Sequence, residues 1–154
     1  SIGSSAFARC DSLRGLEIPA GVDDGISSAL KGSGGSYPHL NEVKFAEGSP
    51  YDIYDGVLYK GTVLETQLDE SQTEVTVKAG TTEIRPWAFG SIVSNREHVM
   101  ERIIFQDDSL TVIGDYAFQY CKSLKEIDIP NSVTSIGTQA FMECISLEIA
   151  EFRE

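Results

Sequence analysis

A 23-residue internal repeat is the feature that most constrains how this chain can fold. Between Leu110 and Phe152 the same apolar pattern occurs twice, each member returning 23 positions later. The first copy places it at Ile113, Ala117, Phe118, Cys121, Leu124, Ile127 and Ile129, and the second at Ile136, Ala140, Phe141, Cys144, Leu147, Ala150 and Phe152. A period of this length indicates a solenoid, in which each unit buries its apolar side chains by stacking on its neighbours.

Within one unit, the spacing predicts a short strand. Ile127 and Ile129 alternate with Glu126 and Asp128, which is typical of a strand with one buried face. The segment 116–121 is too short for an independent helix and is expected to form a helical turn that packs Phe118 inward. Because like units advance in one direction, their strands should pair in parallel.

The rest of the chain contains weaker copies of the same unit. Residues 2–22 repeat the pattern, and Pro19 follows the strand as Pro130 does later. A degenerate second copy contains a loop at 31–38 and a strand near Val43, and the array resumes at 75–89. The next segment, 90–105, is five residues longer than its counterpart in the later units, and part of it, around 93–100, is expected to form a longer helical turn.

An insertion interrupts the array at about 51–68. Asp55–Gly56 between apolar residues is a strong hairpin signal, and a second turn follows at 60–62. The pattern predicts a small β-meander that projects from the array. Its tyrosines, Tyr51, Tyr54 and Tyr59, are either interface anchors at an exposed tip or residues that pack the hairpin onto the array.

The pattern SIGxxAFxxCxSLxxIxIPxSV and the mid-array DGVLY hairpin resemble the BspA-like (Treponema pallidum-type) leucine-rich repeats. This resemblance implies a leucine-rich-repeat solenoid: a curved, right-handed, mainly β superhelix with short helical turns and a parallel sheet on its concave side. It also implies a secreted or cell-surface bacterial protein used for interaction or adhesion, with no family-wide catalytic residues. We expect 1–154 to form one domain of about six strand rungs. Ser1 begins inside a repeat and neither end has a polar cap, which favours a fragment of a longer array and possible end-to-end self-association.

Charge and composition exclude several functions. The chain has 24 acidic and 12 basic residues, a net charge of −12, which disfavours nucleic acid and anionic membranes as partners. The chain contains no apolar run of the roughly 18 residues that are needed to span a membrane, so no membrane insertion is expected. The glycine-rich segment 32–35 lacks the lysine of a phosphate loop, and no nucleophile-elbow or zinc-protease pattern occurs. We therefore expect no catalytic residues and no cofactor.

The cysteines share one repeat position. Cys10, Cys121 and Cys144 are therefore expected to be buried free thiols, with a Cys121–Cys144 disulfide as the alternative. His39 and His98 lie in loop-like segments and are expected at the surface, which leaves too few ligands for a zinc site. No metal is expected, although the pair Asp107–Asp108 leaves a weak Ca²⁺ site as a minor alternative.

The strand register predicts a binding face from the outward residues. They form two columns, one of Glu17, Lys44, Thr76, Ile104, Asp128 and Glu151, and one of Gly15, Glu42, Glu74, Arg102, Glu126 and Ile149. Six acids against two bases make this concave face either a solvated surface or a site for a basic or hydroxyl-rich partner. The candidate binding residues are Glu17, Glu42, Lys44, Glu74, Thr76, Arg102, Glu126 and Asp128. Ala150 stands where Ile127 would, so the last strand either shifts register or ends the core shallowly.

These observations favour a non-enzymatic, extracellular or cell-surface module that binds a protein or glycan ligand. Two alternatives remain at this point. One is a structural spacer or assembly element, and the other is a carbohydrate-binding accessory domain of a surface protein.

Overall fold

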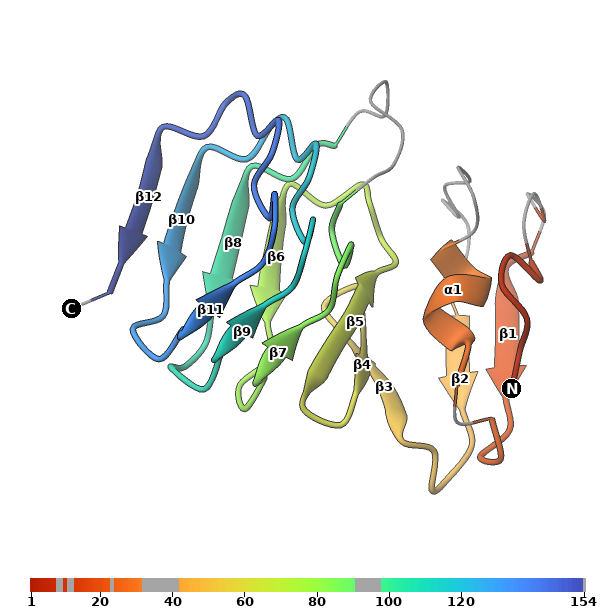
Figure 1. Cartoon of the computed structure of the whole chain (residues 1–154). Helices are drawn as coiled ribbons and strands as arrows, with labels where there is room; N and C mark the ends of the chain where they lie inside the picture. The colour runs from red at the N-terminus through yellow and green to blue at the C-terminus, as the bar shows by residue number, and fades with distance from the viewer. Residues whose placement is uncertain (8–9, 11–12, 23, 32–41, 91–97, 154) are drawn as a thin grey trace.

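The computed structural model describes residues 1–7, 10, 13–22, 24–31, 42–90 and 98–153. In this part the chain winds into a solenoid of short strands joined by tight turns, with one short helix near the N-terminus (Figure 1). The elements are β1 (Gly15–Ile18), α1 (Ile26–Lys31), β2 (Glu42–Phe45), β3 (Tyr51–Tyr54), β4 (Val57–Lys60), β5 (Val63–Gln67), β6 (Glu74–Val77), β7 (Glu83–Ile84), β8 (Arg102–Phe105), β9 (Val112–Ile113), β10 (Glu126–Ile129), β11 (Ser135–Ile136) and β12 (Ile149–Phe152).

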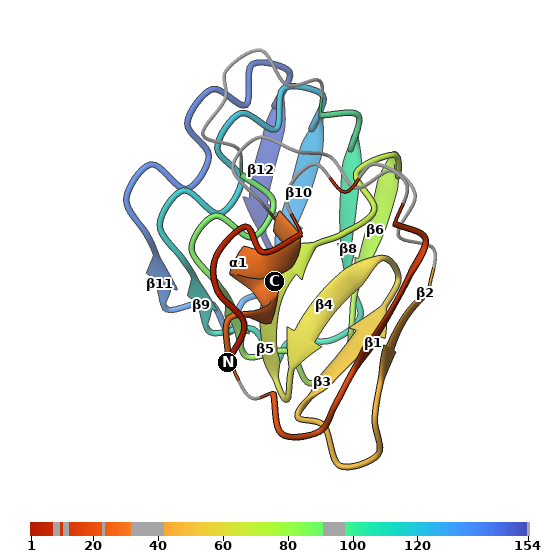
Figure 2. The same ribbon diagram turned by 90° about the vertical axis from the view of Figure 1, so that its right-hand side faces the viewer.

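The strands form three sheets. A four-stranded parallel sheet has the order β12-β10-β8-β6, and a six-stranded sheet has the order β11-β9-β7-β5-β4-β3. The parallel pair β1-β2 stands at the N-terminal end. Figure 2 looks along the stack and shows β9 and β11 on the opposite side from β8 and β10. Each later unit thus gives a longer strand to one sheet and a two-residue strand to the other, and the predicted parallel solenoid is confirmed.

A ladder of phenylalanines fills the space between the sheets. The ring of Phe118 stacks on Phe89 at 5.0 Å and on Phe141 at 5.1 Å between centroids, with the planes nearly parallel. The rings stack because the same repeat position recurs in each unit, one rung above the last. The ladder lies in one continuous cluster of buried residues from β4 to the last unit.

Two of the three cysteines lie beside this ladder as free thiols. Cys144 donates from Sγ to the carbonyl of Phe118 at 3.1 Å, and Cys121 donates to that of Phe89 at 3.7 Å. The prediction of core thiols is therefore confirmed for both, and the alternative disulfide is not formed. Burial raises the pKa of the Cys144 thiol to about 11. The prediction is wrong for Cys10, which is exposed, because no earlier unit in the described chain covers it.

The turn before the phenylalanine of each Ala–Phe pair is tight, with one residue in the left-handed region, and it contains no helix. Ser5, Trp87, Tyr116 and Gln139, which precede the Ala–Phe pair in four units, all have positive φ angles between 52° and 64°. Bonds between units hold this geometry, because the amide of Trp87 donates to Asp115 O at 3.1 Å and that of Tyr116 donates to Thr138 O at 2.9 Å. The expected longer turn at 93–100 lies mostly outside the described residues. His98 at its end is only 5 % exposed, so the surface prediction is wrong for it; His39 lies outside the described part.

The inserted hairpin has the predicted turn but a different position. Asp55 and Gly56 both have positive φ, as the two-residue turn between β3 and β4 requires. The meander does not project from the array, as predicted, but forms part of the six-stranded sheet, where β5 pairs in parallel with β7. The reason is burial on both faces: Val57, Leu58 and Tyr59 are all fully buried.

The hairpin separates two hydrophobic clusters. Leu58 and Tyr51 pack with Ile18, Ile26 and Leu30 of the N-terminal unit. Val57 and Tyr59 point the other way, into the core of the array. Because successive side chains of a strand point to opposite faces, one strand closes both cores. In Figure 1, β3 and β4 accordingly lie between β2 and β6.

Side chains of the hairpin also occupy the free edge of the four-stranded sheet. A carboxylate oxygen of Asp55 accepts the amide hydrogen of Thr76 in β6 at 2.6 Å. The hydroxyl of Tyr59 accepts the amide hydrogen of Lys78, just after β6, at 3.1 Å. These acceptors replace a neighbouring strand, so the sheet ends at β6 and does not continue to β2.

Tyr59 should make the stability of the fold sensitive to high pH. Burial raises the pKa of Tyr59 to about 12, whereas an unfolded tyrosine titrates near pH 10. The fold favours the neutral phenol, so this contribution is complete below about pH 10 and is lost as the pH rises towards about 12. We expect the free energy of unfolding of the native protein to fall by about 2–3 kcal/mol more than that of Tyr59→Phe across this range.

Urea unfolding at steps between pH 9 and pH 12 measures this difference. Tyr59→Phe also loses the acceptor for the Lys78 amide, so its stability is lower at neutral pH, but its pH slope should be flatter. Parallel pH profiles for the two proteins would show that Tyr59 does not carry the effect.

Candidate functional site

The outward side chains of the four-stranded sheet form the candidate site, called here the outer face. Strand pairing places Glu74 opposite Arg102, and Glu126 opposite both Arg102 and Ile149. In the second column Thr76 lies opposite Ile104, and Asp128 lies opposite Glu151. The predicted register is therefore confirmed across this sheet. The last strand keeps it too, and because all four residues of β12 are exposed, the array ends shallowly without a register shift.

The three N-terminal candidates lie on a different sheet. Glu17 of β1 is paired with Lys44 of β2, and Gly15 with Glu42. The side chain of Glu42 is outside the described part. The hairpin stands between β2 and β6, so these residues do not continue the columns of the outer face as the sequence predicted.

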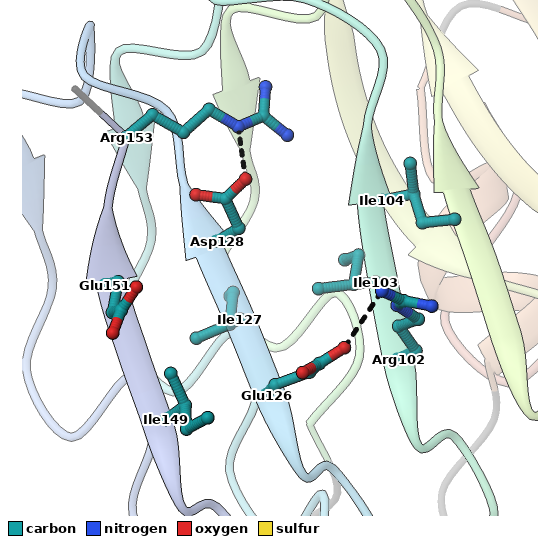
Figure 3. Close-up of a pocket in the computed structure, with 9 residues that line it drawn as sticks. All are labelled: Arg102, Ile103, Ile104, Glu126, Ile127, Asp128, Ile149, Glu151 and Arg153. Atoms are coloured by element: carbon teal, nitrogen blue, oxygen red, sulfur yellow. Dashed lines mark hydrogen bonds and ion pairs between the residues drawn. The ribbon is translucent and has the colours of Figure 1, made fainter.

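A depression of about 440 Å³ lies on the outer face near its C-terminal end. It crosses β8, β10 and β12 and is open to solvent (Figure 3). Its lining consists of Arg102, Ile103, Ile104, Glu126, Ile127, Asp128, Ile149, Glu151 and Arg153. Of the predicted binding residues, the structure thus brings together Arg102, Glu126 and Asp128, while Glu74 and Thr76 lie on β6 at the far edge of the same sheet.

Two ion pairs hold the arginines of the depression in place. Arg102 lies 3.0 Å from a carboxylate oxygen of Glu126, and Arg153 donates from Nε to Asp128 at 2.7 Å. Arg153 also lies 3.4 Å from Asp108 and donates to the carbonyl of Phe105 at 3.0 Å. The hydrogen bond to Asp128 raises the pKa of Arg153. Both guanidinium groups are therefore paired with the protein's own carboxylates, and Arg153, with three acceptors and 26% exposure, is held more firmly than Arg102, which is 57% exposed.

Arg153 was missing from the sequence-based candidates because it follows the last strand. A repeat-aligned reading offers the signal: the residue directly after the strand is Pro19 in the first copy and Pro130 in the unit before, and arginine replaces it here. This signal is weak, because Lys78 already occupies the same position after β6 and Gln106 occupies it after β8.

The acidic pair considered for Ca²⁺ is already used within the protein. Asp107 accepts the amide hydrogens of Gly80 at 2.8 Å and Ser109 at 3.1 Å, and the bond from Gly80 holds the pKa of Asp107 below its usual value. Asp108 pairs with Arg153. Within the described residues, no group of three or more histidine, cysteine, aspartate or glutamate side chains is placed to hold a metal ion.

The three hairpin tyrosines are placed mainly in packing positions. Tyr59 is fully buried and Tyr51 is 6 % exposed, stacked on Phe45 at 5.9 Å between centroids. Tyr54 is half-buried, and its hydroxyl accepts a hydrogen bond from Gln106 at 2.8 Å. Tyr54 is thus the member of the set that retains a surface for a partner.

Comparison with known proteins decides the family. The model of the BspA type leucine-rich repeat region matches residues 1–66 and 95–154, in six copies. The chain belongs to this family. No curated protein sequence matches it.

Two solved structures resemble this BspA type repeat chain. A leucine-rich repeat protein from Eubacterium ventriosum is 26% identical, with a TM-score of 0.64 over 92% of this chain. A leucine rich cell surface protein from Faecalibacterium prausnitzii is 20% identical, with a TM-score of 0.52 over 92% of this chain, and this likeness concerns the fold alone. The chain spans 36% and 48% of the length of these two proteins.

The family pattern explains where specificity can reside in this chain. The inward positions of the BspA type units repeat isoleucine, phenylalanine and cysteine, whereas the outward positions differ from unit to unit. The residue types on the outer face are therefore not set by the repeat pattern, unlike those of the core. In the described chain, no helix has the length and apolar character needed to cross a membrane.

Proposed function

We propose that this chain is a non-enzymatic interaction module of a cell-surface or secreted protein, and that it binds a protein partner through the outer face. The observation that carries this proposal is the depression on β8, β10 and β12, where isoleucines and fixed ion pairs share one exposed surface. Such a lining offers a partner both apolar contact and charge complementarity. Solenoids commonly bind their partners on such sheet faces.

The location and the larger context are part of the same proposal. The Faecalibacterium prausnitzii protein of similar fold is described as a cell surface protein, which supports an extracellular site for this chain. Both similar structures are longer than the chain, which supports a single leucine-rich-repeat domain within a longer array. The net charge of −12 makes a basic partner more favourable than nucleic acid or an anionic membrane.

A charge-reversal variant tests the outer face. In a screen of purified extracellular proteins and a glycan array, we expect the triple variant Glu74→Lys, Glu126→Lys and Asp128→Lys to bind the identified protein partner about tenfold more weakly or worse, because like charges then meet the partner. The matched control is Asp24→Lys, Glu47→Lys and Glu143→Lys, which makes the same change in net charge at exposed acids outside this face.

Circular dichroism checks that both variants keep the fold. Equal binding by the two variants would remove the outer face from the proposal. Binding to glycans alone would favour a carbohydrate-binding domain instead.

One observation favours assembly as a second candidate function. The last unit exposes large apolar side chains, with Ile145 72 % exposed, Phe152 55 % and Ile136 41 %. Either the next unit of a longer array or a second copy stacked on this end would bury them. Under this candidate, light scattering after size exclusion shows a dimer that Ile145→Asp converts to a monomer, and a strict monomer rejects it.

A further inference from the structure

We propose that the depression on the outer face takes a basic side chain, a lysine or arginine of an extended peptide segment of the partner. The alkyl stem of this side chain lies on Ile149, and its cation pairs with Glu151. The inference rests on the proposed function and names the partner chemistry that this surface recognises.

The apolar half of the site stands out from the rest of the outer face. Ile104 and Ile149 are the large apolar residues in two columns that are otherwise polar or glycine. Both line the depression, and Ile149 is 47 % exposed. Ile104 lies on β8 at the opposite corner of the depression from Ile149, with β10 between them (Figure 3), so the apolar contact beside Glu151 comes from Ile149.

The charged half of the site is determined by which groups are already paired. Arg102 is bound to Glu126, and Arg153 is bound to Asp128. Glu151 lies beside Asp128 across the strand pair, and within the described residues no hydrogen bond or ion pair engages its carboxylate. Three carboxylates therefore face two guanidinium groups around the depression, and the unbalanced negative charge falls on Glu151.

This arrangement fits a cation that carries an alkyl stem. Ile149 and Glu151 are two residues apart in β12, so their side chains emerge on the same face about 7 Å apart. Lysine and arginine cover apolar surface with their stems while their charged ends reach polar groups. An acidic side chain fits less well, because both arginines are held by carboxylates of the protein itself.

Titration of the ¹⁵N-labelled chain with short Gly–Ser peptides tests the assignment. The peptides differ in one central residue: lysine, arginine, norleucine or glutamate. We expect lysine and arginine peptides to shift the amide signals of β12, and Glu151→Gln to weaken their binding about two- to fivefold, the range of an exposed ion pair. Ile149→Ser should also weaken it, and the matched control Glu143→Gln, an exposed acid of the same unit, should leave it unchanged. Salt at about 1 M should remove most of the preference for a cation.

Several results would overturn the inference. The inference fails if the norleucine peptide binds as tightly as the lysine peptide, or if the glutamate peptide binds more tightly than either. It also fails if Glu151→Gln and Glu143→Gln weaken binding equally, or if millimolar peptide causes no shift of the β12 amide signals. The triple charge reversal keeps this test separate from the proposed function. If the reversal abolishes partner binding while Glu151→Gln has no effect on the peptides, the outer face stands and the basic-side-chain assignment fails.

Discussion

We expect the Phe118→Ala variant to lose about 3–5 kcal/mol of its free energy of unfolding, which is a large part of the stability of a chain this size. Phe118 is fully buried and is stacked between Phe89 and Phe141. Its removal leaves a cavity in the middle of the ladder and breaks two ring contacts at once, each worth about 0.5–1.5 kcal/mol. Urea unfolding followed by circular dichroism measures the loss.

The repeat supplies its own control at the same position one unit later. Phe141 is half-buried and stacks on Phe118 from one side only. Phe141→Ala should therefore cost clearly less than Phe118→Ala. Equal losses would mean that the ladder is not the element that joins the units.

The units were predictable because periodicity reports burial directly. The alternation of Ile127 and Ile129 with Glu126 and Asp128 indicates one buried face, and β10 has that pattern. The 23-residue spacing also predicts which outward residues become neighbours, as the pairing of Glu126 with Ile149 shows. Both predictions depend only on local geometry that each unit repeats.

The insertion was harder to place because its surroundings are not repeated. The hairpin turn at Asp55–Gly56 is a local signal and was found, but its position depends on contacts with two separate clusters. The sequence does contain one sign of this: Val57, Leu58 and Tyr59 are three consecutive apolar residues, which is typical of a strand buried on both faces.

The depression was only partly predictable for a related reason. The outward columns contained Ile104, Ile149 and Glu151, but their meaning depends on which charges are paired. Arg153 pairs with Asp128 and Asp108, and the latter contact joins residues 45 positions apart. Periodicity within a unit gives no information about such a contact, so the unpaired carboxylate of Glu151 becomes apparent only in the folded chain.

Because β4 is buried on both faces, we expect substitutions at two adjacent residues of this strand to destabilise two different hydrophobic clusters. Leu58→Ala should cost about 2–5 kcal/mol, and the loss should fall mainly on the N-terminal unit, since Leu58 packs against Ile18, Ile26 and Leu30. Tyr59→Ala should cost about 3–5 kcal/mol and should act on the array, since Tyr59 belongs to the other cluster. Adjacent residues of one strand would thus weaken opposite ends of the molecule.

Hydrogen exchange with mass spectrometry distinguishes these outcomes. Leu58→Ala should raise exchange in β1, α1 and β2 while β8 and β10 remain protected, and Tyr59→Ala should give the reverse order. The fluorescence of Trp87, the single tryptophan, reports on the array and should respond to Tyr59→Ala before Leu58→Ala. In a solenoid each unit contacts only its neighbours, so a hairpin that lies between two units can limit the loss of stability to the units on one side of it. Identical exchange profiles for the two variants would show instead that the hairpin joins one cooperative core.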